Sequence, residues 1–228
     1  MENKVINIAI VAEVAEALKE LNEQMVFVGG AVVSLYTDDP SSDEIRPTAD
    51  VDLTINLLNY ADWVKMQERL AELGFSPNPE GKSICSYLYN NIAIDIMPAE
   101  DSSIGPSNTW YKIGFENLQH IEVKGQQITV FSAPCYLATK FEAYNDRGTD
   151  YRTSHDFEDI MNILDNRTLI VNEILDADQK VKEYLQSEIQ KIMDSPFSDE
   201  IISCHIHPLV QDERIPIIMD KISKILNA

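Results

Sequence analysis

Three aspartates are the residues whose type and spacing point most directly to chemistry. Asp50 and Asp52 lie in a stretch where polar and apolar residues alternate, as they do in a β-strand with two different faces. Residues i and i+2 of a strand point to the same side, so the two carboxylates can converge. Asp95 interrupts the apolar run 92–97, where an unpartnered carboxylate is unfavourable. Clustered carboxylates repel unless a cation neutralises them, and oxygen ligands select hard cations. We therefore predict a site for magnesium, with manganese as the alternative.

The spacing of two acids is not sufficient evidence by itself. Asp176 and Asp178 have the same spacing but fall where two helical patterns meet, and two residues on a helix lie about 200° apart. That pair is expected to diverge. For the pair on the strand, the alternative is a solvated surface strand. For Asp95, the alternative is an exposed strand end.

Gly29 and Gly30 follow the short apolar run 25–28 and precede the pattern of a short helix over residues 31–36. A turn between a strand and a helix offers backbone amides and a helix N-terminus to a phosphate group. A tight structural turn explains the same residues equally well. The two glycines are therefore candidate phosphate-binding residues.

The elements that must position these residues change in character along the chain. Up to residue 132 the patterns alternate between strands and helices, with Asn90-Asn91 and Lys124-Gly125 as hairpin turns. From residue 133 onward the patterns are helical. We predict a mixed N-terminal domain, residues 1–132, and a helical C-terminal lobe, residues 133–228. The expected helices cover residues 6–23, 60–73, 134–146, 156–164, 168–175, 178–193 and 213–226.

Composition limits the possible partners. The chain has 228 residues, 44% of them hydrophobic, and no apolar run long enough to cross a membrane. The N-terminal residues lack the pattern of a signal peptide, so we expect a cytoplasmic protein. The net charge of −20 disfavours non-specific nucleic-acid binding, which normally needs clustered Lys and Arg. A small anionic substrate remains compatible with that charge if a divalent metal is bound.

Together the motifs resemble the signature of the nucleotidyltransferase superfamily, which has a DNA polymerase β-like fold. Its members carry a hydrophobic-Gly-Gly turn, a strand with two acids and a third acid on a neighbouring strand. Further segments resemble members from toxin–antitoxin and abortive-infection systems, the AbiEii-type toxins. The resemblance spans residues 25–165 and rests on Phe27-Val28-Gly29-Gly30, Arg46-Pro47-Thr48-Ala49, Asp50-Val51-Asp52-Leu53, Ile94-Asp95-Ile96, Ala138-Thr139-Lys140-Phe141-Glu142-Ala143, Arg147-Gly148 and His155-Asp156-Phe157-Glu158-Asp159-Ile160.

The resemblance implies an α+β fold, a mixed sheet with flanking helices followed by a helical lobe that completes a cleft. It implies that Asp50 and Asp52 hold metal ions on the nucleotide phosphates. Asp95 would complete the metal site and help to activate the attacking hydroxyl. The turn at Gly29 and Gly30 would bind the β- and γ-phosphates.

The resemblance also implies three further substrate-binding residues. Lys140 would neutralise charge on the triphosphate, and Arg46 would contact a phosphate. Asp156 would contribute from the start of a helix. Two of them have an ordinary explanation as well. Arg46 can form a salt bridge within its acidic loop, and an acid in the first turn of a helix stabilises the helix dipole.

The implied activity is transfer of a nucleoside monophosphate from a nucleoside triphosphate to an acceptor hydroxyl on RNA, a protein or a small molecule. The toxin relatives suggest an antitoxin partner. A catalytically inactive protein of the same fold, binding a nucleotide or a protein partner, is the alternative. One departure from the superfamily pattern is the long separation of Gly30 and Asp50. The extra residues fall in the acidic loop 37–48, which we interpret as a lid, a substrate-selecting loop or a partner site.

Overall fold

The chain divides into two units, each with its own set of contacts. The first comprises Met1–Ser34 with Glu44–Ser132, and the second comprises Leu35–Asp43 with Ala133–Ala228. This computed structural model describes residues 2–40, 45–57, 59–81, 83–100, 105, 107–148 and 150–228, with side chains from residue 7 onward. The expected α+β fold is confirmed, because a mixed sheet with flanking helices is followed by helices alone. The prediction that the helical lobe completes a cleft stays a prediction.

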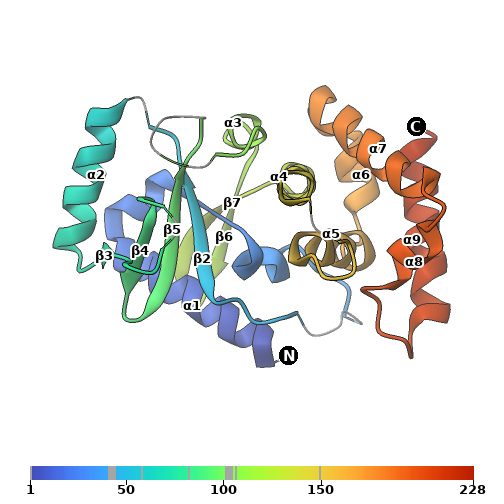
Figure 1. The fold of residues 1–228 in the computed structure, drawn as a ribbon, viewed down its shortest axis with the longest axis horizontal. Coiled ribbons are helices and arrows are strands. Elements are labelled where there is room, and N and C mark those ends of the chain that lie inside the picture. Colours follow the sequence, from blue (N-terminus) through green and yellow to red (C-terminus); the bar gives the residue numbers. More distant parts are fainter. Residues whose placement is uncertain are drawn as a thin grey trace. The chain divides into compact units, whose positions relative to one another are not determined.

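A mixed sheet forms the centre of the first unit (Figure 1). Within the described residues it has seven strands, which are β1 (Met25–Val28), β2 (Asp50–Ile55), β3 (Ser76–Pro77), β4 (Ser86–Tyr89), β5 (Ile92–Pro98), β6 (Leu118–Val123) and β7 (Gln126–Phe131). Their spatial order is β3-β4-β5-β2-β1-β7-β6. β2 pairs with β5, and β1 with β7, in parallel, and the other neighbours are antiparallel.

Both predicted hairpins are confirmed. Asn90 and Asn91 join β4 to β5 with φ angles of 48° and 65°. Lys124 and Gly125 join β6 to β7 with φ angles of 48° and 84°. Two positive φ angles define the turn whose twist matches that of the flanking strands. Asn and Gly adopt this left-handed conformation more readily than most residues, so Asn90, Asn91 and Gly125 favour these turns, while Lys124 adopts it without such a preference.

One face of the sheet is covered by helix α2 (Tyr60–Glu72). The side chain of Gln67 in α2 donates a hydrogen bond of 3.1 Å to the hydroxyl of Tyr87 in β4. Tyr87 pairs with Ile94, and neighbouring residues in paired strands share a face, so α2 lies on the side of Ile94. Asp95 follows Ile94 and points to the opposite face. The face that carries the acids is thus the one that α2 leaves uncovered.

A short helix, α3 (Tyr111–Gly114), packs on the acid-bearing face of the sheet. The hydroxyl of Tyr111 lies 3.9 Å from the sulfur of Met97, which is two residues beyond Asp95 and shares its face. Gly114 approaches Phe131 of β7 so closely that a Cβ at this position would lie 2.7 Å from the ring. The sequence patterns did not predict α3, because a single helical turn is too short to show a period.

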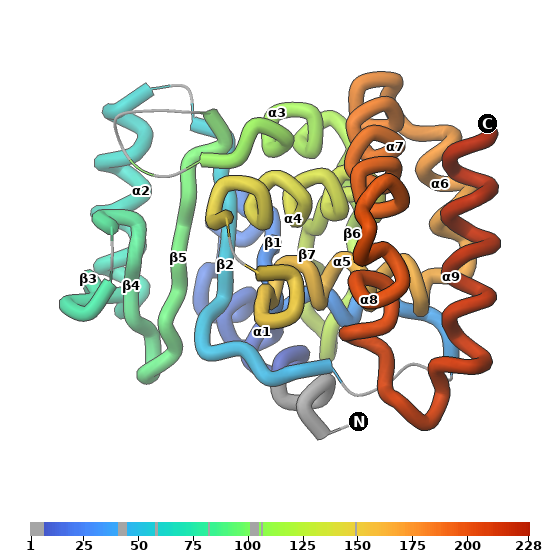
Figure 2. Tube along the Cα trace, turned by 45° about the vertical axis from the view of Figure 1, so that its right-hand side comes forward, coloured from blue at the N-terminus to red at the C-terminus, as the bar shows by residue number. Residues whose placement is uncertain are grey.

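Helices make up the second unit. They are α4 (Ala133–Arg147), α5 (His155–Asn166), α6 (Ile170–Leu175), α7 (Gln179–Asp194), α8 (Ser198–Ser203) and α9 (Gln211–Leu226). The tube in Figure 2 shows α6, α7 and α9 side by side, with α8 below α7. Helix α4 packs against α5, α6 and α7. In the first unit, α1 (Glu2–Leu18) and the 3₁₀ helix η1 (Lys19–Gln24) replace the single predicted helix. No described helix combines the length and the apolar character needed to cross a bilayer.

The first residues of the acidic loop are held within the second unit. The backbone amides of Asp38 and Asp39 both donate to the carbonyl of Asn166, at 3.0 Å. Asp38 also accepts a hydrogen bond from the backbone amide of Thr168, and Asp39 forms an ion pair of 2.8 Å with Arg214. Residues 41–44 of the loop lie outside the described residues. Asp38 and Asp39 are therefore anchored at the junction of α5 and α6.

Candidate functional site

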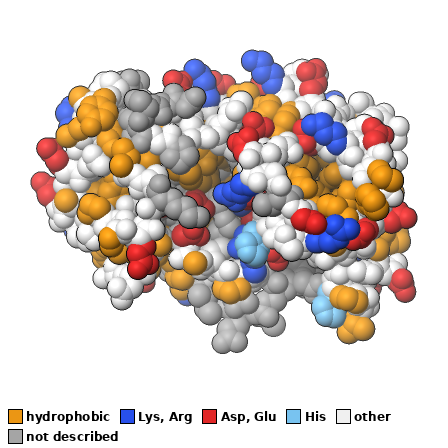
Figure 3. Space-filling view, viewed as in Figure 1, with side chains coloured by type: hydrophobic (Ala, Val, Ile, Leu, Met, Phe, Trp, Pro, Cys, Tyr) orange, Lys and Arg blue, Asp and Glu red, His pale blue; other side chains and the backbone are white. Residues whose placement is uncertain are grey.

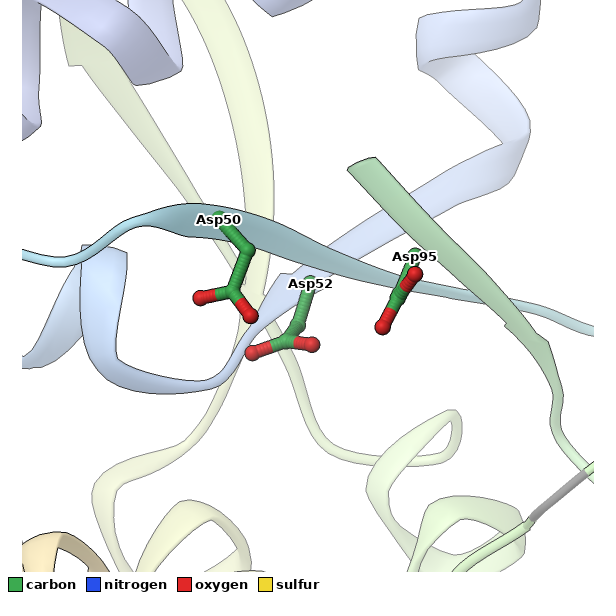
Figure 4. A group of neighbouring side chains, drawn as sticks. All are labelled: Asp50, Asp52 and Asp95. Atoms are coloured by element: carbon green, nitrogen blue, oxygen red, sulfur yellow. The ribbon is translucent and has the colours of Figure 1, made fainter. Parts of the chain in front are cut away.

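The parallel pairing of β2 and β5 brings the three predicted acids together. Asp52 is the register partner of Asp95, and Asp50 lies two residues earlier on the same face of β2. One carboxylate oxygen from each aspartate can be chosen so that all three lie within 4.8 Å of one another. In Figure 4 the three side chains project from the two strands in the same direction. The strand pattern predicted that Asp50 and Asp52 converge, and the resemblance placed Asp95 on a neighbouring strand.

Alternation along the two strands explains why the acids point outward. The intervening residues Val51 and Ile94 are completely buried on the opposite face. Asp50 is exposed, whereas Asp52 and Asp95 are half-buried. Three carboxylates this close repel one another, and only oxygen ligands are present. That donor set fits a hard divalent cation such as magnesium or manganese.

Gly29 brings the turn after β1 against this cluster. Its φ angle is 68°, a left-handed backbone conformation that residues other than Gly and Asn rarely adopt. A Cβ atom at this position would overlap the carboxylate of Asp52. Gly29 is thus needed twice, once for the backbone conformation and once for the close approach to Asp52. A side chain here would push the acid out of the cluster.

Gly30 lies against the segment that leads into β2, and it begins the 3₁₀ helix η2 (Gly30–Leu35). A Cβ atom on Gly30 would lie 2.8 Å from Nη2 of Arg46 and 2.9 Å from Cγ2 of Thr48. The guanidinium of Arg46 is therefore placed directly beside the glycine turn. The structure thus brings six predicted site residues together in the first unit: Gly29, Gly30, Arg46, Asp50, Asp52 and Asp95.

The two other predicted site residues, Lys140 and Asp156, meet each other in the second unit. The ammonium of Lys140 lies 3.2 Å from Asp156 and 2.7 Å from Asp159. All three residues are at most 5% exposed. Arg147 forms a further ion pair with Asp156. Two basic and two acidic groups thus neutralise each other between α4 and α5.

Comparison with known proteins reports on the fold. No protein-family model matches this sequence, and no curated protein sequence matches it significantly. The crystal structure of an antigenic nucleotidyltransferase-like protein from Paracoccidioides brasiliensis superimposes with a TM-score of 0.54 at 18% sequence identity. The match covers 86% of this chain and 91% of that one. This chain has a nucleotidyltransferase-like fold.

A second solved structure, ANT(2")-Ia in complex with adenylyl-2"-tobramycin, has a TM-score of 0.47 at 13% identity, covering 81% of this chain and 97% of that one.

Within the nucleotidyltransferase-like fold, the acid-bearing face holds a residue that we did not predict from the sequence. Ser86 of β4 pairs with Asp95, so its side chain shares the face of the acid one strand further along. It is 6% exposed, and its hydroxyl accepts a hydrogen bond of 3.2 Å from the side-chain amide of Asn78. The sequence could have predicted this position. Counting outward from the two-residue turn at Asn90-Asn91 pairs residue 86 with residue 95.

Cys85 directly precedes Ser86, and its side chain is completely buried. Burial raises the pKa of Cys85, a hydrogen bond from Ser83 opposes that shift, and the negative charge of Asp95 adds to it. A thiol in this environment stays protonated at neutral pH. The three acids are therefore the groups of this site that could hold a metal ion.

Proposed function

We propose that this protein is a nucleotidyltransferase that depends on a divalent metal and transfers a nucleoside monophosphate from a nucleoside triphosphate to an acceptor hydroxyl. The observation that carries the proposal is the convergence of Asp50, Asp52 and Asp95 beside the turn at Gly29. The nucleotidyltransferase-like fold supports it. A solvated acidic strand does not explain why a glycine is needed against Asp52.

The three carboxylates would hold magnesium or manganese. When bound, the metal would neutralise phosphate charge and stabilise the entering and leaving oxygens of an in-line displacement. The Gly29-Gly30 turn and the guanidinium of Arg46 would bind the phosphates. Gly29 lies against Asp52, and Arg46 lies against Gly30, so both groups are next to the metal-binding acids. Arg46 is suited to this role, since a guanidinium presents several donors to phosphate oxygens at once.

The reaction would begin with attack of the acceptor hydroxyl oxygen on the α-phosphorus. A new phosphorus–oxygen bond forms, and the bond to the bridging oxygen breaks, so pyrophosphate leaves with that oxygen. Asp95 would accept the hydrogen bond of the acceptor hydroxyl and take its proton. Because Asp95 and Ser86 share a face, we place the acceptor on the side of β4 and the nucleotide on the side of β1.

Charge bears on the class of acceptor. The net charge is −20, and in the view of Figure 3 acidic side chains are scattered over the surface. Such a surface disfavours a long nucleic acid held along its backbone. A small molecule or a protein hydroxyl is therefore favoured over RNA. The resemblance to AbiEii-type toxins extends the proposal to a toxin with an antitoxin partner. Growth arrest on expression of the wild type, but not of Asp50→Asn/Asp52→Asn, would support that extension.

Nucleotide binding tests the core of the proposal. Each of the four ribonucleoside triphosphates is titrated into the wild type and into Asp50→Asn/Asp52→Asn by calorimetry, with magnesium and with a chelator. We expect magnesium-dependent binding of at least one nucleotide by the wild type only. If the wild type binds none of the four nucleotides, the proposal is overturned.

Turnover separates the enzyme from the alternative, an inactive protein of the same fold. Pyrophosphate release is measured with the bound nucleotide and with RNA, protein and small-molecule acceptors. Release that requires the acid pair supports the enzyme. Magnesium-dependent binding without release from any acceptor class would instead support a nucleotide-binding protein without catalysis.

A further inference from the structure

Asn7 is a polar residue on the apolar face of α1. It precedes Val11, Val14 and Leu18 at intervals of four, three and four residues, the spacing of one helix face. Those three side chains are completely buried, and Asn7 itself is 1% exposed. An amide at such a position is unfavourable unless its donor and acceptor are both hydrogen-bonded.

Both ends of the Asn7 amide bind the backbone of one distant segment. Its Nδ2 donates a hydrogen bond of 3.0 Å to the carbonyl of Arg46. Its Oδ1 accepts a hydrogen bond of 3.2 Å from the backbone amide of Thr48. Pro47 lies between them, has no N–H of its own and has a restricted φ angle. The segment from Arg46 to Thr48 is therefore held from both sides of the proline.

This segment carries the candidate phosphate-binding group toward the glycine turn. The side chains of Arg46 and Thr48 both lie against Gly30. Asp50, the first residue of β2, follows Thr48 by two residues. A shift of the segment would therefore move the guanidinium of Arg46 relative to the turn, whereas Asp50 is held in the sheet by its pairing with Ala93.

We propose that Asn7 is a positioning residue that holds Arg46 beside Gly30 for binding of the triphosphate. The proposal rests on the proposed function, since it assumes that Arg46 contacts phosphate. Asn7 would not touch the substrate, and its effect on nucleotide affinity would pass through Arg46. A purely structural asparagine would instead affect the stability of the unit without a specific link to Arg46.

A double-mutant cycle tests this link. Magnesium-dependent binding of each ribonucleoside triphosphate is measured calorimetrically for the full-length wild type, Asn7→Ala, Arg46→Ala and the double variant, with thermal midpoints recorded in parallel. We expect Asn7→Ala to weaken binding about tenfold, within the range of coupling between residues in contact. In the Arg46→Ala background the same substitution should change affinity by less than about twofold.

Asn22 provides a matched control. Its Nδ2 also donates to a distant backbone carbonyl of the first unit, that of Gln127, at 2.7 Å. Asn22→Ala should lower the thermal midpoint without changing nucleotide affinity. Should Asn7→Ala fail to fold, Asn7→Leu replaces it in the cycle, because a neutral side chain of similar size fills the buried space and removes both hydrogen bonds.

The outcomes distinguish the two proposals. If the wild type binds no nucleotide in the presence of magnesium, the proposed function is refuted, and the role of Asn7 fails with it. If the wild type binds and Asn7→Ala binds equally well, only the role of Asn7 is refuted. Equal losses in the wild-type and Arg46→Ala backgrounds would likewise show that Asn7 does not act through Arg46.

Discussion

Replacing Asp95 by asparagine should stabilise the metal-free protein. One oxygen from each of the three acids lies within 4.8 Å of the other two, a separation at which two unit charges repel by about 0.9 kcal/mol in water. Asp95 has two such neighbours, Asp50 and Asp52, so neutralising it removes about 1.7 kcal/mol of repulsion. Because Asp52 and Asp95 are half-buried, the water value is a lower bound. Asparagine keeps the shape of the side chain, so packing should change little.

The effect is measurable as a rise in the thermal midpoint. In a chain of this size, each kcal/mol corresponds to roughly 2–4 °C, so Asp95→Asn should unfold about 3–7 °C higher than the wild type in a chelator at low salt. Magnesium should reverse the order. Binding at 100 times the dissociation constant adds about 2.7 kcal/mol to the wild type, and the variant should gain much less. Differential scanning calorimetry at several salt concentrations checks both effects, because salt should reduce the first.

Asp178→Asn is the matched control for this experiment. It changes the net charge by the same amount, and asparagine caps a helix as well as aspartate does, so the cap on the amide of Lys180 is kept. Its midpoint should move by no more than about 1–2 °C with or without magnesium. A midpoint for Asp95→Asn that is equal to or below that of the wild type in chelator would refute the reasoning. The three carboxylates would then not repel one another as their spacing requires.

Three further predictions concern Gly29, Lys140 and Asp165. Gly29→Ala should lower stability by about 1–3 kcal/mol and abolish magnesium binding, because its Cβ overlaps Asp52; unfolding and calorimetric titration measure both. Lys140→Met should cost about 3–5 kcal/mol, measured by urea unfolding, because two buried acids of α5 lose their main partner. Burial raises the pKa of Asp165 above 3.8, so the folded state keeps this proton longer than the unfolded chain. Its contribution to the unfolding free energy should therefore fall as the pH rises from about 3.8, and Asp165→Asn should remove that slope in urea titrations from pH 3 to 7.

The acid cluster could be predicted from the sequence because it depends on local rules. Alternation along β2 places Asp50 and Asp52 on one face, and an apolar run marks the strand of Asp95. The hairpin turn at Asn90-Asn91 has a two-residue loop, which fixes its register. Only the parallel pairing of β2 with β5 is non-local, and the resemblance to the nucleotidyltransferase superfamily provided that step.

The surroundings of the cluster could not be predicted in the same way. Arg46 lies beside Gly30 because Asn7, 39 residues earlier in the chain, binds its carbonyl. Periodicity places Asn7 on a buried helix face, which marks it as a residue that needs partners. It does not say which backbone groups those partners are. Contacts between side chains and backbone groups distant in sequence leave no period and no fixed spacing.

Lys140 shows how a motif can be recognised while its contacts stay hidden. Asp156 and Asp159 are three residues apart on α5 and therefore lie on one helix face. Their burial with the ammonium of Lys140 between them depends on how α4 packs on α5. With both acids in contact, the charge of Lys140 is already neutralised within the second unit. For this ammonium to neutralise a triphosphate, as the resemblance implies, phosphate oxygens would have to compete with the two carboxylates for its charge. The affinity of Asp159→Asn for nucleotide therefore decides between the two roles. Tighter binding would show that the carboxylate competes with phosphate for Lys140, and unchanged binding would show that the lysine serves the packing of the two helices.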